Sequence, residues 1–333
     1  MNNKNLMIIA ELGINHNGSL KIAKKLVDVA KASGANYVKI QNYIPDLIVT
    51  RNTPKAKYQR NHGNNKTMYE MLKKYYFNFD KTTELIKYCK KKKINFLSSP
   101  FDEVSFQFLK KKKINLIKVA SGEITNYPLL KLIAKYNKKL ILSTGMANMR
   151  EVKNSINFLC KNGQSRNKIY VLHCTSQYPT KLKNVNLKAM ITLKNELKLK
   201  TGLSDHTQGF EAGICAVFLG AEIIEKHITL NRKMKGPDHS TSMEPSEFRS
   251  FVRSLNNSTI IGGSAVKKPT KEEKILSNLV RKRIVAKQHI LKNELFSVNN
   301  ITVKRCNTGI KAEKFFNILN KKAKKNYKPD EPI

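Results

Sequence analysis

Residues 201–228 read TGLSDHTQGFEAGICAVFLGAEIIEKHI, and this stretch decides the fold. Two short apolar runs, 201–205 and 221–228, are typical of buried strands, and residues with helical periodicity lie between them. Each run carries a histidine at or just past its end, namely His206 and His227. A strand, a helix and a second strand form the repeating unit of α/β proteins.

The same unit recurs along the whole chain, which has 333 residues. Nearly every apolar run ends in a residue able to do chemistry, which a random scatter of reactive residues would not produce. Eight strand–helix units are what a (β/α)8 TIM barrel requires, and such barrels keep their active sites at the carboxyl ends of the strands. We therefore predict an α/β fold of the TIM-barrel type and an enzyme. The other six runs cover residues 6–12, 37–41, 95–100, 116–121, 140–144 and 169–174.

Composition and cysteine spacing fit a large globular domain. Apolar residues make up 40% of the chain and charged residues 26%, and no apolar run approaches the length of about 18 residues that a membrane span needs. Because Asn2–Asn5 are followed by only a brief apolar stretch, we expect no signal peptide. The five cysteines are widely spaced and include no CxxC pair, so we expect reduced thiols in a cytoplasmic protein without a membrane segment.

The strongly basic balance raises one alternative function. Lys and Arg number 63 against 24 Asp and Glu, a formal net charge of +39. A basic chain of this kind can bind RNA or DNA through phosphate contacts. However, the lysines are spread over the predicted outer helix faces, and no aromatic residues alternate with them. A non-catalytic basic RNA-binding protein therefore remains only a remote alternative, and we expect no specific nucleic-acid partner.

The chain is predicted to divide into two domains. We assign residues 1–258 to the catalytic barrel, with its last helix near 246–256, and residues 259–280 to a loop-rich linker containing Gly262, Gly263 and Pro269. Residues 281–333 would form a small domain with strand-like pieces at 283–286 and 301–303 and a helix-like piece at 311–319. Such a domain is too small to be an enzyme by itself, and a lid or an interaction module is more plausible.

The second and third strand-like runs are separated by an unusually long connection. Its excess, residues 45–75, is where a barrel would place a loop that covers the substrate.

The histidine pair and its neighbours suggest a metal site. His206 and His227 end successive strands, so their imidazoles should converge at the barrel mouth, where two such ligands suit a divalent transition metal. For two histidines alone, a hydrogen bond within the barrel is an equally good interpretation. Their surroundings favour the metal, because Asp205 precedes His206, Glu225 and Lys226 precede His227, and Asp238 lies on the next loop.

A second group of residues is cationic and hydroxylic. Lys39 and Lys118 each stand between two apolar residues of a strand-like run, and a lysine buried there is costly unless it meets an anion. Together with nearby serines they suit a phosphate or carboxylate group. Glu11 and Glu123 at strand ends add candidates for acid–base work or for binding sugar hydroxyls. These features suggest condensation of a phosphorylated anion with a carbonyl compound. The serines are Ser99, Ser121, Ser143 and Ser204.

These motifs, taken in order, resemble the sialic acid synthases. The barrel segments that match are 10–19 (AELGINHNGS), 38–41 (VKIQ), 96–101 (FLSSPF), 118–123 (KVASGE), 142–146 (LSTGM), 173–179 (HCTSQYP), 202–206 (GLSDH), 224–227 (IEKH) and 236–239 (GPDH). Residues 301–305 (ITVKR) resemble the antifreeze-like (SAF) domain that follows the barrel in that family. The resemblance covers almost the whole chain.

The resemblance implies that phosphoenolpyruvate condenses with N-acetylmannosamine to give N-acetylneuraminate and phosphate by C–O cleavage. It implies Mn²⁺, or another divalent cation such as Mg²⁺ or Co²⁺, held by His206 and His227. It makes Glu11 the candidate general base, and it places Glu123 with the two histidines among the catalytic residues. The positions that match the phosphoenolpyruvate site are Lys39, Gln41, Ser99, Lys118, Ser121, Ser143 and Ser204. The positions that match the sugar site are Asn64, Glu123, Tyr178, Asp238 and Arg305.

The resemblance also implies an assembly and leaves the sugar open. Arg305 matches an arginine that the small domain supplies to a neighbouring subunit, which implies a domain-swapped homodimer. The following residues 306–309 (CNTG) depart from the family's usual Pro-Gly-Asn-Gly turn, which puts the aim of Arg305 in question. N-acetylmannosamine is the favoured sugar. The alternative is a legionaminic or pseudaminic acid synthase, which uses a 2,4-diacetamido-2,4,6-trideoxyhexose.

Overall fold

The computed structural model describes residues 6–56 and 67–333. The chain forms two compact units, Met1–Gly263 and Ser264–Ile333, and each is described here by itself.

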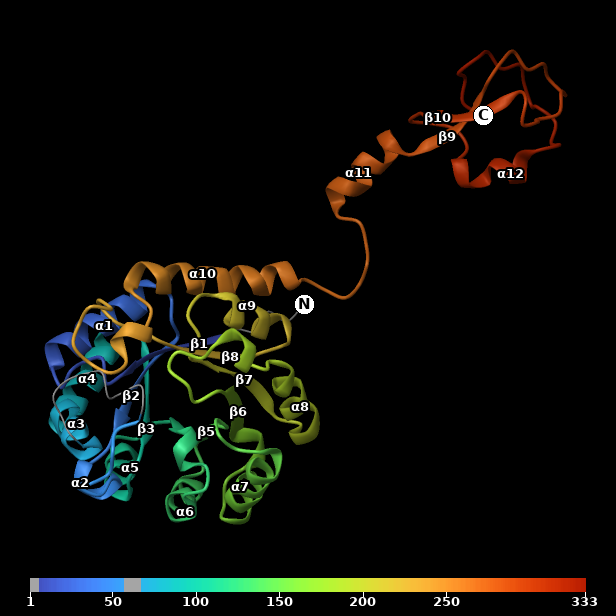
Figure 1. The fold of residues 1–333 in the computed structure, drawn as a ribbon. Helices are drawn as coiled ribbons and strands as arrows, with labels where there is room; N and C mark the ends of the chain where they lie inside the picture. The colour runs from blue at the N-terminus through green and yellow to red at the C-terminus, as the bar shows by residue number, and fades with distance from the viewer. Residues whose placement is uncertain (1–5, 57–66) are drawn as a thin grey trace. The chain divides into compact units, whose positions relative to one another are not determined.

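The first unit is a closed barrel of eight parallel strands, which confirms the predicted TIM barrel (Figure 1). Strand β1 pairs with both β2 and β8, and this register places Glu11 beside Lys39 on one side and His227 on the other. The strands are β1 (Met7–Gly13), β2 (Tyr37–Asn42), β3 (Asn95–Pro100), β4 (Leu116–Val119), β5 (Lys139–Ser143), β6 (Ile169–Cys174), β7 (Lys200–Asp205) and β8 (Ile223–His227).

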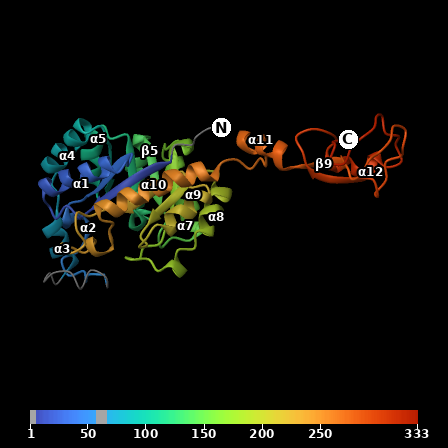
Figure 2. The ribbon, with the colours of Figure 1, turned by 90° about the horizontal axis from the view of Figure 1, so that it is seen from above.

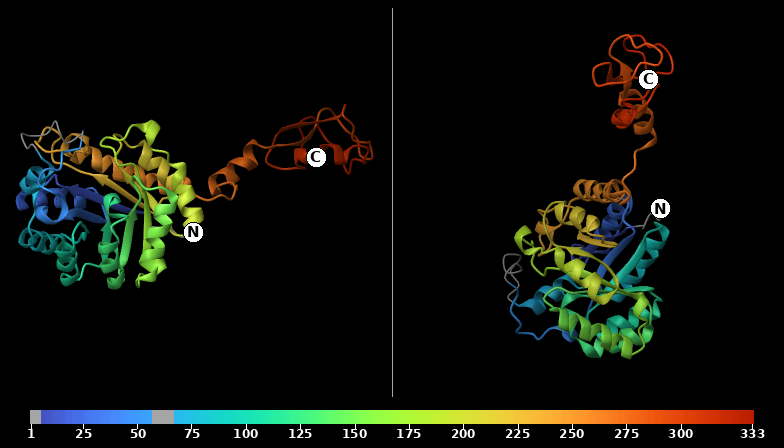
Figure 3. Two further views of the ribbon diagram at one scale, coloured as in Figure 1. Left: turned by 60° about the horizontal axis from the view of Figure 1, so that its bottom comes forward. Right: turned by 90° about the vertical axis from the view of Figure 1, so that its right-hand side faces the viewer.

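Helices surround the ring of strands, as Figures 1 and 3 show. Each carries an apolar stripe that packs against the strands, so most of the hydrophobic core lies between the two layers. The last of them, α10 (Pro245–Gly262), lies across α1 (Leu20–Ala32) and α9 (Glu211–Phe218) (Figure 2). The others are α4 (Phe79–Lys91), α5 (Glu103–Lys111), α6 (Tyr127–Tyr136), α7 (Met149–Lys161) and α8 (Lys188–Leu197).

The inside of the barrel is built in layers by the two-residue repeat of the strands. A cluster of buried apolar side chains fills the interior on the side away from the carboxyl ends of the strands: Ile9, Leu97, Leu116, Ile141, Leu172 and Ile223. Side chains two residues further along a strand point to the same side, one layer higher. This layer is polar on nearly every strand: Glu11, Ser99, Lys118, Ser143, Cys174 and Glu225. The apolar layer therefore closes the barrel beneath a polar mouth.

The long connection between β2 and β3 carries the short helices α2 (Pro45–Ile48) and α3 (Met68–Tyr75). A small cluster of Ile14, Tyr43, Met71 and Tyr75 anchors α3 beside the carboxyl ends of β1 and β2. The described part of the predicted covering loop therefore begins and ends near the barrel mouth, and its central residues 57–66 lie outside the described residues.

The second unit contains the expected pair of strands. Strands β9 (Lys282–Ala286) and β10 (Ile301–Arg305) form an antiparallel sheet over a small core that includes Ile284, Phe296 and Tyr327. A short helix, α12 (Phe315–Ile318), lies in the segment predicted to be helical.

The turn after β10 forms despite its unusual sequence. Gly309 has φ +93°, in the left-handed region, and a Cβ there would lie 2.7 Å from the Cβ of Pro332. Arg283 also donates a hydrogen bond to the Gly309 carbonyl at 3.0 Å. The one glycine that residues 306–309 retain therefore stands where the backbone requires it.

The predicted linker 259–280 differs from the structure. Helix α10 continues to Gly262, and a further helix, α11 (Lys271–Val280), occupies the second half of the segment. Thr270 caps α11 in a reciprocal capping box with Glu273. The cluster of glycines and Pro269 hid this start signal in the sequence.

The cysteines and the helices bear on two expectations from composition. All five cysteines are free thiols. Within residues 6–56 and 67–333, no helix has both the length and the apolar character needed to cross a bilayer.

Candidate active site

A cavity of about 330 Å³ opens at the carboxyl ends of the barrel strands. Most of the residues predicted from the sequence line it, although they come from eight different strands or strand-end loops. They are Glu11, Lys39, Gln41, Ser99, Lys118, Ser121, Ser143, Tyr178, Ser204, His206 and His227. The remaining lining residues include Ala56, Phe101, Met146, Cys174, Ser176 and Glu225.

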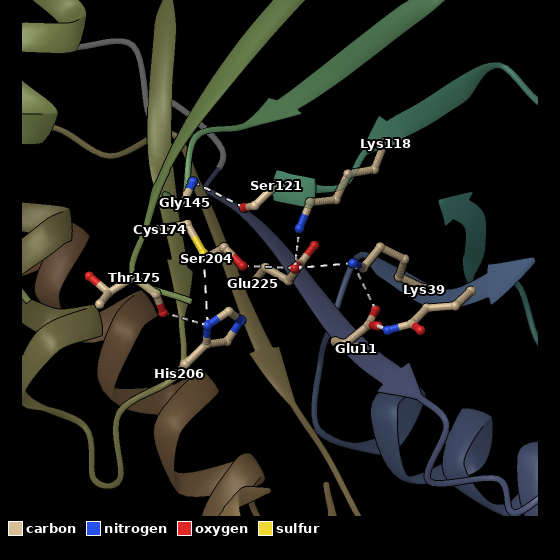
Figure 4. A network of polar contacts seen from close by, with 11 residues as sticks. Glu11, Lys39, Lys118, Ser121, Gly145, Cys174, Thr175, Ser204, His206 and Glu225 are labelled. Atoms are coloured by element: carbon tan, nitrogen blue, oxygen red, sulfur yellow. Dashed lines mark hydrogen bonds and ion pairs between the residues drawn. The ribbon is translucent and has the colours of Figure 1, made fainter. Parts of the chain in front are cut away.

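The floor of this cavity is a network of buried charges (Figure 4). Lys39 Nζ lies 3.1 Å from Glu11 Oε2 and 3.2 Å from Glu225 Oε1. Lys118 Nζ lies 2.5 Å from the same Glu225 oxygen. Gln41 extends the network with a long contact of 3.5 Å from its Nε2 to Glu11 Oε1. Two ammonium groups thus share two carboxylates, and all four side chains are almost completely buried.

Burial and pairing shift these groups in different directions. Burial raises the pKa of Glu11 to about 7, against the opposing effect of Lys39. Burial acts in the same direction on Glu225, but Lys118 and Lys39 outweigh it and hold the Glu225 pKa well below the ordinary value. Burial alone would lower the pKa of Lys39, which Glu11 and Glu225 instead raise. For Lys118, burial dominates and the pKa is lowered.

Several hydroxyl groups face the same space. Among the described residues, the buried hydroxyls of Ser99 and Ser143 have no hydrogen-bond partner. Ser204 donates to Glu225 Oε1 at 3.0 Å, and Ser121 Oγ accepts from the Gly145 backbone N–H at 3.0 Å. Unpartnered buried hydroxyls are uncommon, so their presence beside two ammonium groups indicates a site for an anion.

The two histidines converge as the sequence predicted. Their ring centroids are 5.6 Å apart, and the Tyr178 ring lies 4.1 Å from His206 and 5.8 Å from His227. His206 Nδ1 is 2.9 Å from the Thr175 carbonyl. Burial would lower the pKa of His206, but Cys174 and the Thr175 carbonyl raise it. When the ring is neutral and Nδ1 donates, Nε2 keeps its lone pair, which is the usual arrangement of a metal-binding histidine.

The donor set fits a divalent transition metal. His227 Nδ1 is buried and has no hydrogen-bond partner among the described residues. Burial and the neighbouring His206 and Lys39 hold the His227 pKa well below its usual value, so the ring stays neutral, as a metal ligand must. In the described ranges, no group of three or more His, Cys, Asp or Glu is arranged around one metal position. Two histidines would therefore leave several positions for water and substrate.

Gly13 lies beside both His227 and Asp238. A Cβ at Gly13, whose φ is +50°, would lie 3.2 Å from His227 Cε1 and 3.3 Å from Asp238 Oδ2. Only a glycine fits between the two side chains without strain. Burial raises the pKa of Asp238 to about 6, although His206 opposes this shift.

Two predicted residues of the first unit, Glu123 and Asp238, are not among the residues that line the cavity. Glu123 follows β4 and accepts a hydrogen bond from Asn126 at 2.6 Å, and burial raises its pKa. Arg305 is exposed at the end of β10 in the second unit. Asn64 lies outside the described residues.

Among the unpredicted residues of the cavity wall, two are ionisable, Glu225 and Cys174. The signal that could have found them is their spacing, because each stands two residues after a buried apolar residue, as Glu11 does. Burial would raise the pKa of Cys174, but His206 and Lys118 lower it to about 6. By contrast, Asp205 pairs with Lys226 at 2.7 Å outside the mouth, so this carboxylate is no part of the site.

A larger hollow of about 730 Å³ lies at the opposite ends of β2 to β5. Its lining includes Cys89, Phe96 and Lys113, and none of the predicted site residues. The predicted site residues therefore lie at the smaller cavity and not at the larger one.

Comparison with known proteins agrees with this geometry. A sequence profile of the NeuB family matches residues 26–267. The chain is 46% identical over 331 residues to the N,N'-diacetyllegionaminic acid synthase of Campylobacter jejuni, covering 99% of each chain. It is 39% identical over 322 residues to the enzyme of the same name from Legionella pneumophila, covering 96% of this chain and 90% of the relative.

A solved structure gives the same picture. The N-acetylneuraminic acid (sialic acid) synthetase of Leptospira borgpetersenii, in complex with citrate, superposes with a TM-score of 0.71 at 32% identity. The match covers 82% of this chain and 90% of that one. With its eight-stranded barrel, its cavity of paired lysines and histidines and these matches, the chain belongs to the NeuB family of nonulosonic acid synthases, which condense phosphoenolpyruvate with a sugar.

Proposed function

We propose that this enzyme is a legionaminic acid synthase, which condenses phosphoenolpyruvate with 2,4-diacetamido-2,4,6-trideoxymannose. The identities to the two legionaminic acid synthases, 46% and 39%, exceed the 32% identity to the sialic acid synthetase. This reverses the order favoured by the sequence alone, which put N-acetylmannosamine first. A pseudaminic acid synthase remains the third candidate.

The observation that supports the reaction type is the joint lining of one cavity by two lysines and two histidines. Lys39 and Lys118 suit the phosphate and carboxylate groups of phosphoenolpyruvate, together with the hydroxyls of Ser99 and Ser143, which have no partner within the described ranges. Gln41, Ser121 and Ser204 line the same cavity and would complete this anion site.

His206 and His227 would hold a divalent metal, with Mn²⁺ as the first candidate and Mg²⁺ or Co²⁺ as alternatives. When bound, the metal would act as a Lewis acid on the aldehyde oxygen of the open-chain sugar. Tyr178, whose ring is tilted against His206 and meets the His227 ring edge-on, would orient the sugar beside them. Asp238, Glu123, Asn64 and Arg305 are the further positions we assign to sugar recognition.

The carbon–carbon bond would form between C3 of phosphoenolpyruvate and C1 of the sugar aldehyde. Positive charge then develops at C2, and water adds there. Glu11 lies beside the lysines and has a pKa of about 7, so near neutral pH it can accept the proton of that water. Cleavage of the C2–O bond of the resulting tetrahedral intermediate releases phosphate and leaves the 2-keto acid.

Phosphate release from phosphoenolpyruvate with Mn²⁺ tests the proposal. Release should be fast with 2,4-diacetamido-2,4,6-trideoxymannose and slow with N-acetylmannosamine. The opposite preference would make the enzyme a sialic acid synthase and would leave the reaction type intact. No release with either sugar, or with the pseudaminate precursor, would contradict the reaction type itself.

A further inference from the structure

Glu225 occupies the centre of the anion site. Its Oε1 accepts hydrogen bonds from Lys118 Nζ at 2.5 Å and from the Ser204 hydroxyl at 3.0 Å, and it lies 3.2 Å from Lys39 Nζ. Figure 4 shows these three side chains pointing at the one carboxylate. All three donors are residues that we assign to the phosphoenolpyruvate site, so a side chain of the protein itself now holds the place of an anion.

The remaining groups leave little positive charge unpaired. Lys39 is also 3.1 Å from Glu11 Oε2, so two carboxylates balance two ammonium groups. Glu225 Oε2 is buried and has no hydrogen-bond partner among the described residues. In the part of the chain that the structure describes, Glu225 is thus bound through one oxygen only, while every donor around that oxygen is one that a phosphate oxygen could use equally well.

We propose that Glu225 is a built-in competitor for the anion site, which weakens the binding of phosphate-bearing ligands and so lets the product phosphate leave. The entering anion and the Glu225 carboxylate compete for Lys39, Lys118 and Ser204. The competitor also keeps both lysines paired before substrate arrives, when an unpaired buried ammonium group would be costly. The identity of the anion rests on the proposed function, whereas the competition itself does not.

The alternative is that Glu225 only stabilises the barrel as part of a buried ion pair. The two interpretations differ in the sign of one measurement. Removing a competitor strengthens phosphate binding, whereas removing a purely structural anchor leaves the lysines less well placed and leaves phosphate binding unchanged or weaker.

The test is calorimetric titration of the full-length chain with inorganic phosphate at fixed ionic strength. Glu225→Gln keeps the shape and one acceptor oxygen but removes the charge. We expect it to bind phosphate about tenfold more tightly than the unmodified chain, because a nearby like charge in a buried site is strongly unfavourable. Glu222→Gln is the matched control, because Glu222 directly precedes the same strand β8, far from its carboxyl end, and its Oε2 lies 3.5 Å from Lys200 Nζ. It should leave phosphate affinity unchanged.

An affinity of Glu225→Gln within threefold of the unmodified chain, or weaker, overturns the proposal. If this variant does not fold, as judged by circular dichroism, Glu225→Asp decides in its place. Its shorter side chain withdraws the charge from Lys118 and should also tighten phosphate binding by more than threefold. Because the assay uses no sugar and no turnover, its result is independent of whether the proposed sugar is correct.

Steady-state kinetics give a second readout. In the Gln variant, the KM for phosphoenolpyruvate and kcat should both fall, since tighter binding slows phosphate release. A lower kcat with an unchanged or higher KM would contradict the proposal, because loss of an anchor for the lysines produces that pattern.

Discussion

Two histidines at strand ends, His227 and His173, offer a controlled test of the metal assignment. His227→Ala should lower Mn²⁺ affinity by at least about 100-fold and abolish turnover, because one of two ligands is lost. The fold should persist, since His227 Nδ1 has no hydrogen-bond partner among the described residues. Mn²⁺ binding followed by electron paramagnetic resonance, with circular dichroism for the fold, measures both effects.

His173 provides the control for that experiment. Its Nε2 is 2.6 Å from the Val185 carbonyl, so its ring serves the loop after β6 and not the cavity. His173→Ala should therefore lower the melting temperature and keep full Mn²⁺ affinity. Wild-type Mn²⁺ affinity in His227→Ala would contradict the assignment.

Glu11 predicts a pH dependence of activity. Burial raises its pKa to about 7, and only the carboxylate form can accept a proton. The value of kcat/KM should therefore fall as pH drops through about 7, approaching tenfold per pH unit. Glu11→Gln should lower the rate by about 100-fold or more at every pH and remove that part of the pH profile that Glu11 causes. A pH profile of the variant that keeps the same slope would assign the proton transfer to another group.

The site residues that could be predicted from sequence share one feature. Lys39 and Lys118 stand out because each interrupts an apolar run, and a buried lysine demands an anion. Glu225 gave a weaker signal, because it is followed by Lys226 and His227 and reads as one member of a polar cluster at a strand end. Only the three-dimensional distances show that Lys226 turns outward to Asp205, while Glu225 turns inward to the two lysines of the anion site.

At the scale of elements, the turn from β1 to α1 predicts an acid-sensitive stability. His16 is buried against Phe77, with ring centroids 4.4 Å apart, and its Nδ1 accepts the Gly18 N–H at 3.0 Å. Burial lowers the His16 pKa to about 3, with smaller effects of Lys81 and His239. The unfolded chain binds a proton near pH 6.5 and the folded chain does not, so stability falls as pH drops below 6.5.

The expected loss from this group is about 2–3 kcal/mol between pH 7 and pH 4.5. His16→Asn keeps a hydrogen-bond acceptor and removes the titration. It should therefore reduce the slope of unfolding free energy against pH in this window, whatever its effect on stability at pH 7. Urea denaturation at several pH values measures the slope. An unchanged slope in the variant would show that His16 does not carry the acid sensitivity.

The barrel elements could be predicted because their signals are local. Each strand is a short run in which the apolar residues are continuous or alternate with polar ones. The eight runs recur with helices between them. The linker helix α11 was missed because Gly262, Gly263 and Pro269 precede its cap at Thr270. Helices α2 and α3 were also missed, since α2 (Pro45–Ile48) is only one turn long and α3 depends on contacts with Tyr43 and Ile14, which are distant in sequence.

At the scale of the whole molecule, the role of the second unit depends on its residue Arg305. Arg305 is exposed at the end of β10, and none of the other predicted site residues belongs to its unit, Ser264–Ile333. We expect Arg305→Ala to raise the KM for the sugar at least about tenfold, as loss of a charge-assisted hydrogen bond to substrate would, with little change in the KM for phosphoenolpyruvate. Sugar saturation curves at fixed phosphoenolpyruvate measure this. Unchanged sugar saturation would remove Arg305 from the active site.

Whether that arginine serves its own barrel or a second copy can be decided by mixing two variants, one inactive and one impaired in sugar binding. His227→Ala lacks a metal ligand in the barrel, and Arg305→Ala lacks the arginine of the second unit. In a domain-swapped homodimer, each mixed dimer contains one site that combines an intact barrel with an intact arginine. After dissociation and reassociation, half of the dimers are mixed, so activity at low sugar concentration should return to about a quarter of the unmodified level. Mixing either variant with itself is the control. If the arginine acts within its own chain, every site of a mixed dimer lacks either the metal ligand or the arginine. Activity then stays at the average of the two variants.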